Sequence, residues 1–270
     1  MYKLIILIIL IILILLINKY NKVRICETMK STNLKIGIFV ISNGLNKNID
    51  FPPYESRHLR KTYYKRFIFE KKIWLKYRDK HPNIDVHFLE CSNTTKTSKK
   101  FNTEQINCTE SYKPGIFNKT LEAYKKFDNY DFYIRTNLST FIIYNTLINQ
   151  LSSLRTDIPI YTGYRIDSFI QGTSIIMNKK TRDVFVDNNS VVNNDVNTLA
   201  DDVLISMILR YKNIYPTNLK GLYYWNGKES NEYNKNIIDK HNYIFIRTKP
   251  RNIKYNQKSI LKYLYRIYYT

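Results

Sequence analysis

Leu34-Lys35-Ile36-Gly37-Ile38-Phe39-Val40-Ile41 is an apolar run of strand length that ends at the turn residues Ser42-Asn43-Gly44. Further along the chain, Ile84–Leu89 alternates apolar and polar residues, and Tyr130–Arg135 is a third segment of strand length. Such runs, bounded by turn residues, predict buried strands. Because segments with helical periodicity separate them, the sequence predicts an α/β fold with a central sheet.

Periodicity predicts further elements on both sides of these strands. Ser56 can cap a helix whose apolar positions include Leu59, Tyr63 and Phe67. We expect further helices at 117–127, 141–154, around 184–185, at 200–211 and at 255–270, strands at 158–162, 173–177 and 243–247, and a polar loop at 92–104. No internal repeat is visible, so we expect one α/β domain over 34–250 and a basic, Tyr-rich C-terminal helix within 251–270.

The composition is that of a globular protein with a strong codon bias. Of 270 residues, 44% are hydrophobic and 24% are charged, which excludes wholesale disorder and collagen-like or low-complexity chains. The chain has 30 Asn but only 2 Ala, as expected where codons rich in A and T are favoured. The same bias enriches Lys, so the net charge of +21 must be discounted as an indication of function.

Leu4–Ile17 is an unbroken run of Leu and Ile near the start of the chain. As a helix it spans about 21 Å, and with Tyr2 and Tyr20 about 28 Å, close to the hydrocarbon thickness of a bilayer. We expect residues 1–20 to be an uncleaved signal anchor and 21–33 a short stem. A cleaved signal peptide is the alternative, but no small-residue cleavage site follows the run.

The orientation of this anchor has opposing indications. Lys19, Lys22 and Arg24 outnumber Lys3, which by the positive-inside rule favours a cytosolic domain. Asn-x-Ser/Thr sequons favour a lumenal domain, although about four are expected by chance in so Asn-rich a chain. We expect a single-pass, type II membrane protein with a lumenal domain. The sequons begin at Asn93, Asn107, Asn118, Asn137 and Asn188.

Signatures of several enzyme classes are missing. The sequence has no G-x-G-x-x-G, G-x-x-x-x-G-K-[ST], G-x-S-x-G or H-E-x-x-H, so dehydrogenases, P-loop NTPases, α/β-hydrolases and zincins lose their usual support. Cys26, Cys91 and Cys108 lack the paired spacing of a zinc site. Cys91–Cys108 is a plausible disulfide in an oxidising compartment, and free or singly paired thiols are the alternative.

Two polar segments next to predicted apolar elements are candidate sites. Asp201-Asp202 opens the helix predicted at 200–211, where the carboxylates either interact with the helix dipole or provide a general base. Arg135-Thr136-Asn137-Leu138-Ser139-Thr140 follows a predicted strand, and open α/β sheets bind ligands beyond the carboxyl ends of their strands. An ordinary strand-to-helix turn has similar residues.

Residues 57–80 form a strongly basic segment with three interpretations. It can bind nucleic acid. Arg57 or Arg60, near the start of the predicted helix, can bind a diphosphate. The later lysines are also explained by a solvated helix face that codon bias has enriched.

Several short blocks occur in the order found in a known enzyme family. They are Arg57-His-Leu-Arg60-Lys-Thr62-Tyr63 after the first strand, Phe117-Asn-Lys119-Thr120-Leu121, Tyr161-Thr-Gly163, Gly172-Thr-Ser-Ile-Ile-Met177 and Ala200-Asp-Asp-Val203. They resemble the R-x-x-[IL]-R-x-T-W, N-L-x-x-K-T, Y-x-G, G-x-G-Y-[VI]-[LI]-S and E-D-V blocks of the β1,3-galactosyltransferase and fringe-like group of GT-A glycosyltransferases. The resemblance covers roughly 34–211, and more loosely His241–Arg247.

This resemblance implies a GT-A-like, Rossmann-like glycosyltransferase domain with a mixed, mostly parallel sheet flanked by helices. It implies a nucleotide-sugar donor, expected to be a UDP-sugar, a glycan or glycoprotein acceptor, and an inverting transfer of a hexose. By the same resemblance, Asp202 deprotonates the acceptor hydroxyl and Asp201 orients the acceptor. Gly172 and Thr173 then lie on the acceptor side.

The donor side departs from the family pattern. Where the family has a metal-binding D-D-D, this chain has Asn137-Leu138-Ser139, whose neutral oxygens bind a divalent cation less well than carboxylates do. Asn137 and Ser139 are therefore expected to contact the diphosphate or a weakly held Mn²⁺ or Mg²⁺. If metal is required, His241 with Asp201 or Ser139 is the alternative ligand set. The cations expected to offset the diphosphate charge are Arg57, Arg60 and Arg135.

Two rival functions stay open at the level of sequence. One is a catalytically degenerate relative that binds glycans or nucleotides without turning them over. The other is a membrane-tethered basic protein that binds nucleic acid or anionic lipid, with binding that falls steeply with salt. The acidic residues between Asp183 and Asp202 argue against this second rival, and we expect no nucleic-acid partner.

Overall fold

The computed structural model describes residues 34–42, 68–92, 103–219, 221–225, 229–248 and 257–270. The elements described here belong to the compact unit Lys35–Thr270. The expected anchor at 1–20 and stem at 21–33 lie outside the described residues, as do Arg57 and Arg60. Among the helices of the described part, none is long and apolar enough to cross a membrane.

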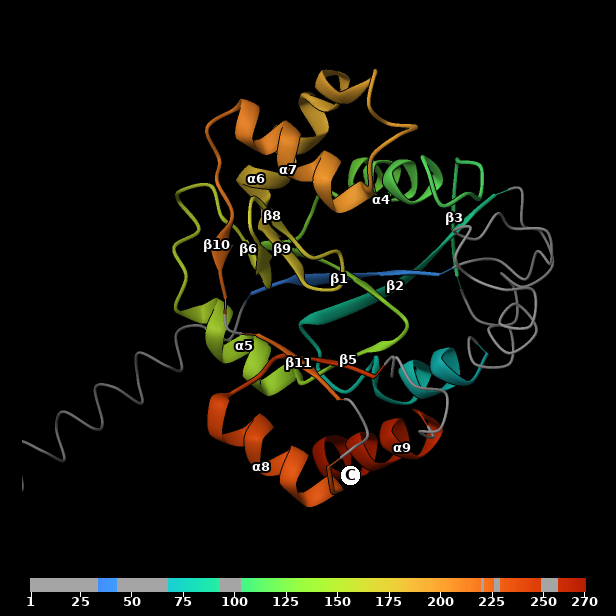
Figure 1. Ribbon diagram of the computed structural model, residues 1–270, viewed down its shortest axis with the longest axis vertical. Coiled ribbons are helices and arrows are strands. Elements are labelled where there is room, and N and C mark those ends of the chain that lie inside the picture. Colours follow the sequence, from blue (N-terminus) through green and yellow to red (C-terminus); the bar gives the residue numbers. More distant parts are fainter. Residues whose placement is uncertain (1–33, 43–67, 93–102, 220, 226–228, 249–256) are drawn as a thin grey trace, which may run out of the picture. The chain divides into compact units, whose positions relative to one another are not determined.

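A seven-stranded sheet lies at the centre of the Lys35–Thr270 unit, with the strand order β10-β6-β9-β4-β1-β2-β3 (Figure 1). Only β9 runs against its two neighbours, and every other pair in this sheet is parallel. The predicted α/β class with a central, mixed and mostly parallel sheet is confirmed. The strands are β1 (Ile36–Ile41), β2 (Ile84–Cys91), β3 (Glu104–Ile106), β4 (Phe132–Asn137), β6 (Tyr161–Gly163), β9 (Ile175–Asn178) and β10 (Thr217–Asn218).

The central strand β1 explains why its sequence is almost continuously apolar. All six of its residues are buried, because β2 and β4 flank it and helices cover both faces of the sheet. Its parallel register brings Ile41 level with Leu89 of β2 and Asn137 of β4. The carboxyl ends of the three strands therefore meet at one edge of the sheet, together with the polar residues that follow them.

Helices cover the two faces of the sheet in two groups (Figure 1). On one face, α4 packs against β1 and β2, α6 packs against β4 and β9, and α7 packs against both helices. The helical residues 68–77, α5, α8 and α9 lie on the other side. The helices are α4 (Gly115–Lys126), α5 (Tyr144–Ser152), α6 (Lys179–Asp187), α7 (Asp201–Tyr211), α8 (Asn231–His241) and α9 (Gln257–Tyr269).

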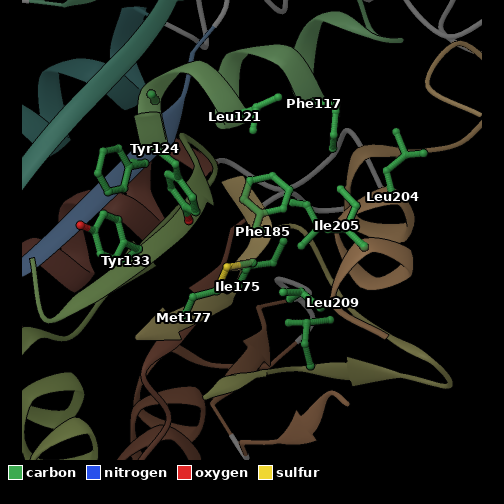
Figure 2. Packing of buried hydrophobic residues seen from close by; sticks show 14 of the residues in the cluster. Phe117, Leu121, Tyr124, Tyr133, Ile175, Met177, Phe185, Leu204, Ile205 and Leu209 are labelled. Carbon is green, nitrogen blue, oxygen red and sulfur yellow. The ribbon is translucent and has the colours of Figure 1, made fainter. Parts of the chain in front are cut away.

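The apolar core on the first face joins three helices to the sheet (Figure 2). Phe117 and Leu121 of α4 face Phe185 of α6, and Leu204 and Ile205 of α7 complete the cluster. The rings of Phe117 and Phe185 meet edge to face with their centroids 6.0 Å apart. This packing fixes the position of α7, which carries Asp201 and Asp202 at its start.

A smaller sheet and a stack of aromatic rings form the other side of the unit. The strands β5 (Thr140–Ile142), β11 (Leu222–Tyr224) and β12 (Phe245–Arg247) make the smaller sheet. The rings of Tyr77 and Tyr269 stack with centroids 4.8 Å apart. The hydroxyl of Tyr269 donates to the carbonyl oxygen of Ile142 at 2.6 Å. The terminal helix is thus present, as predicted, and docks on the unit through tyrosine.

Some predicted elements are wrong in extent. The helix predicted at 141–154 begins only at Tyr144, because Phe141 and Ile142 belong to β5 and pair with β12, a partner about a hundred residues away. Glu104, the last residue of the loop predicted at 92–104, begins the short strand β3, and residues 93–102 lie outside the described residues. No element was predicted between residues 212 and 242, where β10, β11 and α8 lie.

Gly37 lies in β1, where a Cβ atom would be 2.6 Å from Cδ2 of Tyr130 and 2.9 Å from Cε2 of Phe39. We expect Gly37→Ala to lower the free energy of unfolding by about 1–3 kcal/mol, because the rings must move out of a packed core. Urea denaturation of the full-length chain measures this loss. Gly221→Ala is the matched control, since its Cβ would meet no atom closer than 3.5 Å. Equal losses in the two variants would contradict the packing argument.

Candidate active site

The two polar segments predicted as sites meet at the carboxyl end of β4. Because β9 runs antiparallel to β4, the residues just before β9 lie beside the last residues of β4. The hydroxyl of Thr136 donates to the carbonyl oxygen of Thr173 at 2.8 Å. The start of α7 reaches the same place through Asp201 and Asp202, so segments near residues 135, 172 and 201 converge.

Arg135 and Asp201 form a buried ion pair at this point. The Nη2 atom of Arg135 lies 2.5 Å from Oδ2 of Asp201, and their side chains are 6% and 12% exposed. The guanidinium group has room here because Gly172 has no side chain. A Cβ atom at residue 172 would lie 2.2 Å from Nη1 of Arg135. The guanidinium group therefore lies against the backbone of Gly172 and is engaged by a carboxylate.

Asp202 has a different environment from its neighbour. Its Oδ2 atom accepts a hydrogen bond from the backbone N–H of Gly172 at 3.1 Å, and the residue is only partly buried. In the part of the chain that is described, no cation pairs with its carboxylate. The Oδ1 atom of Asp202 accepts from the backbone N–H of Val203 at 3.1 Å. The two adjacent aspartates thus differ: Asp201 pairs with Arg135, whereas each oxygen of Asp202 accepts one backbone N–H and keeps a lone pair for a further donor.

The environment of Asp201 also changes its proton affinity. Burial raises the pKa of Asp201 to about 6, against the opposing effect of the Arg135 cation, and the charge of Asp202 adds to the rise. Asp201 is therefore easier to protonate than an aspartate in water.

The capping interpretation of these aspartates is only part of their role. Both lie in the first turn of α7, where the helix dipole favours negative charge, and the N-cap residue Ala200 makes no side-chain cap bond. Their carboxylates also bind Arg135 and the N–H of Gly172, which belong to other elements. They therefore tie the start of α7 to the edge of the sheet.

The turn after β4 is held from several directions. The Oδ1 atom of Asn137 accepts hydrogen bonds from the hydroxyls of Ser139 at 2.8 Å and Thr140 at 3.0 Å. The carbonyl oxygen of Ser139 accepts from the backbone N–H of Thr248 at 2.8 Å. The indole N–H of Trp74 donates to the carbonyl oxygen of Leu138 at 3.2 Å. The position of this turn is fixed, and the oxygen of Asn137 is already in use.

These residues do not fit a divalent cation. Mn²⁺ and Mg²⁺ favour carboxylate ligands, but the turn offers neutral oxygens, one of them engaged by two hydroxyl donors. Among the described residues, no three or more His, Cys, Asp or Glu side chains are grouped so that they could hold a metal. His241 ends α8, which lies across the sheet from α7 (Figure 1), so it does not join Asp201.

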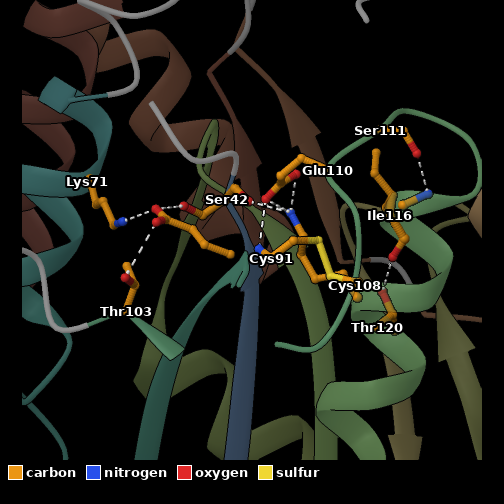
Figure 3. A network of polar contacts seen from close by, with 12 residues as sticks. Ser42, Lys71, Cys91, Thr103, Cys108, Glu110, Ser111, Ile116 and Thr120 are labelled. Carbon is orange, nitrogen blue, oxygen red and sulfur yellow. Dashed lines mark hydrogen bonds and ion pairs between the residues drawn. A yellow bond between two sulfur atoms is a disulfide. The ribbon is translucent and has the colours of Figure 1, made fainter. Parts of the chain in front are cut away.

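Sequence reasoning did not foresee the buried polar network at the ends of β1 and β2 (Figure 3). The Nζ atom of Lys119 donates to the carbonyl oxygen of Ser42 at 2.7 Å and to Glu110 at 2.6 Å. Lys71 pairs with Glu90 at 2.6 Å, and both side chains are fully buried. The prediction of a solvated face is therefore wrong for Lys71, because a buried carboxylate compensates its charge. Lys119 lies in the block that resembles N-L-x-x-K-T, and this resemblance is the one feature of the sequence that pointed to a role for Lys119.

The disulfide between Cys91 and Cys108 joins this network (Figure 3). It links the last residue of β2 to the loop that carries Glu110, and the carboxylate of Glu110 accepts the backbone N–H of Cys91 at 2.9 Å. The pairing that the sequence made plausible is the one present. The bond holds the loop so that Glu110 meets Lys119.

Comparisons with known proteins give weak matches. No protein-family model matches the sequence, and no curated protein matches it. A glycosyltransferase involved in the glycosylation of the major capsid of PBCV-1 is 12% identical with a TM-score of 0.42, over 85% of this chain and 98% of that chain. The galactosyltransferase LgtC, in complex with donor and acceptor sugar analogs, is 10% identical with a TM-score of 0.44, over 87% of this chain and 96% of that chain. Similarity at this level does not assign an activity.

Removing the cation of the buried pair tests its contribution. We expect Arg135→Met to lower the free energy of unfolding at pH 8 by about 3–5 kcal/mol, because a buried carboxylate is left without its partner. The pKa of Asp201 is already raised by burial, and loss of Arg135 raises it further. The folded state then binds a proton more tightly than the unfolded state, so the deficit shrinks as the pH falls from 8 towards 4.

The control for this experiment is the double variant Arg135→Met/Asp201→Asn, which has no buried charge at this position. It should be more stable than Arg135→Met at pH 8 and should lack the pH-dependent part of the deficit. Urea denaturation at a series of pH values measures both. An Arg135→Met protein as stable as the wild type at pH 8 would show that the ion pair contributes nothing.

Proposed function

We propose that the protein is a glycosyltransferase that transfers a hexose from a nucleotide-sugar donor to a hydroxyl group of a glycan or glycoprotein. The observation that carries the proposal is the difference between Asp201 and Asp202 at the carboxyl edge of the sheet. Arg135 pairs with the first, whereas the second is partly exposed and accepts one backbone N–H at each oxygen, which leaves each oxygen a lone pair for a further donor. A carboxylate of this kind, at the edge where α/β sheets bind ligands, suits a general base.

The proposed reaction is a single displacement that inverts the configuration of the anomeric carbon. Asp202 accepts the proton of the acceptor hydroxyl while that oxygen forms a bond to the anomeric carbon. The bond between this carbon and the diphosphate oxygen breaks, and the nucleoside diphosphate leaves with the electron pair. Asp201 and Arg135 hold the start of α7, so that Asp202 has a fixed position relative to the end of β4.

The donor side of the proposal rests on the sequence resemblance and on the place of the turn after β4. Asn137 and Ser139 contact the diphosphate as neutral groups in this scheme. Arg57 and Arg60 offset its charge, because fixed cations near a leaving group stabilise the charge that develops there. Arg135 is not given this role, since Asp201 engages its guanidinium group. A UDP-sugar is the proposed donor by the same resemblance.

We also propose that the domain works in an oxidising, lumenal compartment, behind a membrane anchor within residues 1–20. The Cys91–Cys108 disulfide supports this location, because such bonds persist in the secretory pathway and are rare in the cytosol. The anchor itself is proposed from the Leu and Ile run of residues 4–17.

Asp202→Asn tests the general base. The amide keeps the shape of the side chain but cannot accept the proton, so we expect transfer to fall by about 10²–10⁴-fold. Donor binding and thermal stability should stay close to wild type. The measurement is transfer and donor hydrolysis by the full-length chain with a panel of UDP-glucose, UDP-galactose and UDP-N-acetylglucosamine.

Asp187→Asn is the matched control, since Asp187 is an exposed aspartate at the end of α6. It should leave the rate unchanged. Wild-type transfer by Asp202→Asn would exclude this residue as the base. A wild-type chain that binds the donor but turns over none of the panel would favour the catalytically degenerate relative instead.

The turn after β4 has no carboxylate to bind a metal, so we predict that the donor binds without one. We expect the wild type to bind its UDP-sugar in excess EDTA, as measured by isothermal titration calorimetry. Asn137→Asp/Ser139→Asp adds two negative charges beside the diphosphate, so without metal it should bind the donor more weakly, and added Mn²⁺ should restore binding. Asn137→Ala/Ser139→Ala, which adds no charge, should show no rescue by Mn²⁺. Wild-type binding that disappears in EDTA would overturn this prediction.

A further inference from the structure

Tyr224 presents an exposed aromatic ring beside the segment that binds Asp202. Tyr224 is the last residue of β11 and is 43% exposed. Its hydroxyl donates to Oε1 of Gln171 at 2.7 Å. Gln171 directly precedes Gly172, whose N–H binds the carboxylate of Asp202. The ring of Tyr224 is therefore linked to Asp202, the proposed base, through the side chain of Gln171 and the backbone N–H of Gly172.

The amide group of Gln171 is oriented by two hydroxyl groups. Its Oε1 atom accepts from Tyr224 at 2.7 Å and from the hydroxyl of Thr173 at 3.1 Å. With the oxygen engaged in this way, the Nε2 atom of the same amide points away from both hydroxyls. Within the described part of the chain, Nε2 makes no hydrogen bond, so its two N–H groups are available to a ligand.

Tyr164 fixes the orientation of the exposed ring. Its ring centroid lies 6.1 Å from that of Tyr224, and the two planes are inclined by 75°, which is an edge contact. The hydroxyl of Tyr224 is held by Gln171 at the same time. The ring of Tyr224 therefore has one partner at its hydroxyl and another at one side, while the residue is still 43% exposed.

We propose that Tyr224 and Gln171 bind the sugar ring of the acceptor. This proposal rests on the proposed function and adds the residues that recognise the acceptor. Sugars combine an apolar C–H face with a rim of hydroxyls, so an aromatic ring beside a free amide donor matches both parts. The C–H face stacks on Tyr224, and a ring hydroxyl accepts from Nε2 of Gln171. The acceptor is favoured over the donor because Gly172 connects this surface to Asp202, which acts on the acceptor hydroxyl.

The test separates sugar binding from catalysis. Binding of lactose and of the methyl glycosides of galactose, glucose and mannose to the full-length chain is measured by saturation-transfer NMR. Acceptor KM and donor hydrolysis are measured with the UDP-sugar that the chain turns over. The variants are Tyr224→Ala, which removes the ring, and Tyr224→Phe, which removes only the hydroxyl that holds Gln171. Tyr211→Ala is the control, because Tyr211 is 64% exposed at the opposite end of α7 from Asp202.

We expect Tyr224→Ala to weaken binding of at least one of these sugars, and to raise the acceptor KM, by about tenfold, since truncated aromatic anchors are among the costliest losses in binding sites. Donor hydrolysis should change less than twofold. Tyr224→Phe should show a smaller loss and Tyr211→Ala none. Thermal unfolding confirms that each variant is folded.

The outcomes distinguish this proposal from the proposed function. Sugar binding that depends on Tyr224, in a chain without nucleotide-sugar turnover, supports the sugar site and overturns the glycosyltransferase. If the chain turns over a nucleotide sugar, but Tyr224→Ala changes neither sugar binding nor the acceptor KM, the sugar site alone is overturned. The sugar site is also overturned if the wild-type protein binds none of the sugars. It is overturned as well if Tyr224→Ala loses UDP-sugar binding instead, which would indicate that Tyr224 stacks on the base of the donor.

Discussion

The buried ion pair between Arg135 and Asp201 is the interaction on which the arrangement at the sheet edge depends. It joins the end of β4 to the start of α7, two segments 66 residues apart in the chain. The backbone of Gly172 lies against the guanidinium group, and its N–H binds Asp202, so the pair also fixes the segment before β9. A less direct polar link also joins Asp202 to β4, because Gly172 binds its carboxylate and the adjacent Thr173 accepts from the hydroxyl of Thr136. The apolar core holds α7 on the sheet as well.

Charge compensation inside the fold recurs at the neighbouring strands. Lys119 with Glu110, and Lys71 with Glu90, are further buried pairs near the carboxyl ends of β1 and β2. Removing two charges from water largely cancels their attraction, so such pairs contribute little net stability. We interpret them as contacts that fix the segments of this edge, while the apolar cluster under α4, α6 and α7 supplies most of the stability.

Sequence reasoning was sound where local pattern determines structure. The residues of β1, β2 and β4 predict the sheet, and Arg135, Gly172 and Asp201 are all predicted site residues. What the pattern could not show is pairing at a distance. Whether Arg135 binds a ligand or Asp201, and whether Lys71 is solvated or buried against Glu90, depends on partners that no local window contains. The same limit hid β5, whose partner β12 lies far along the chain, and the link from Tyr224 to Gln171.

The smaller sheet has a consequence for the order of folding. β5 pairs with β12 across about a hundred residues, and Tyr77 stacks on Tyr269 across a still longer separation. Contacts between residues so far apart in the chain require a large loss of chain entropy before they form, which slows folding. Thr248 follows β12 and holds the carbonyl oxygen of Ser139. The turn after β4 therefore reaches its final geometry only when this late pairing closes, so the chain can collapse around its central sheet well before its site is assembled.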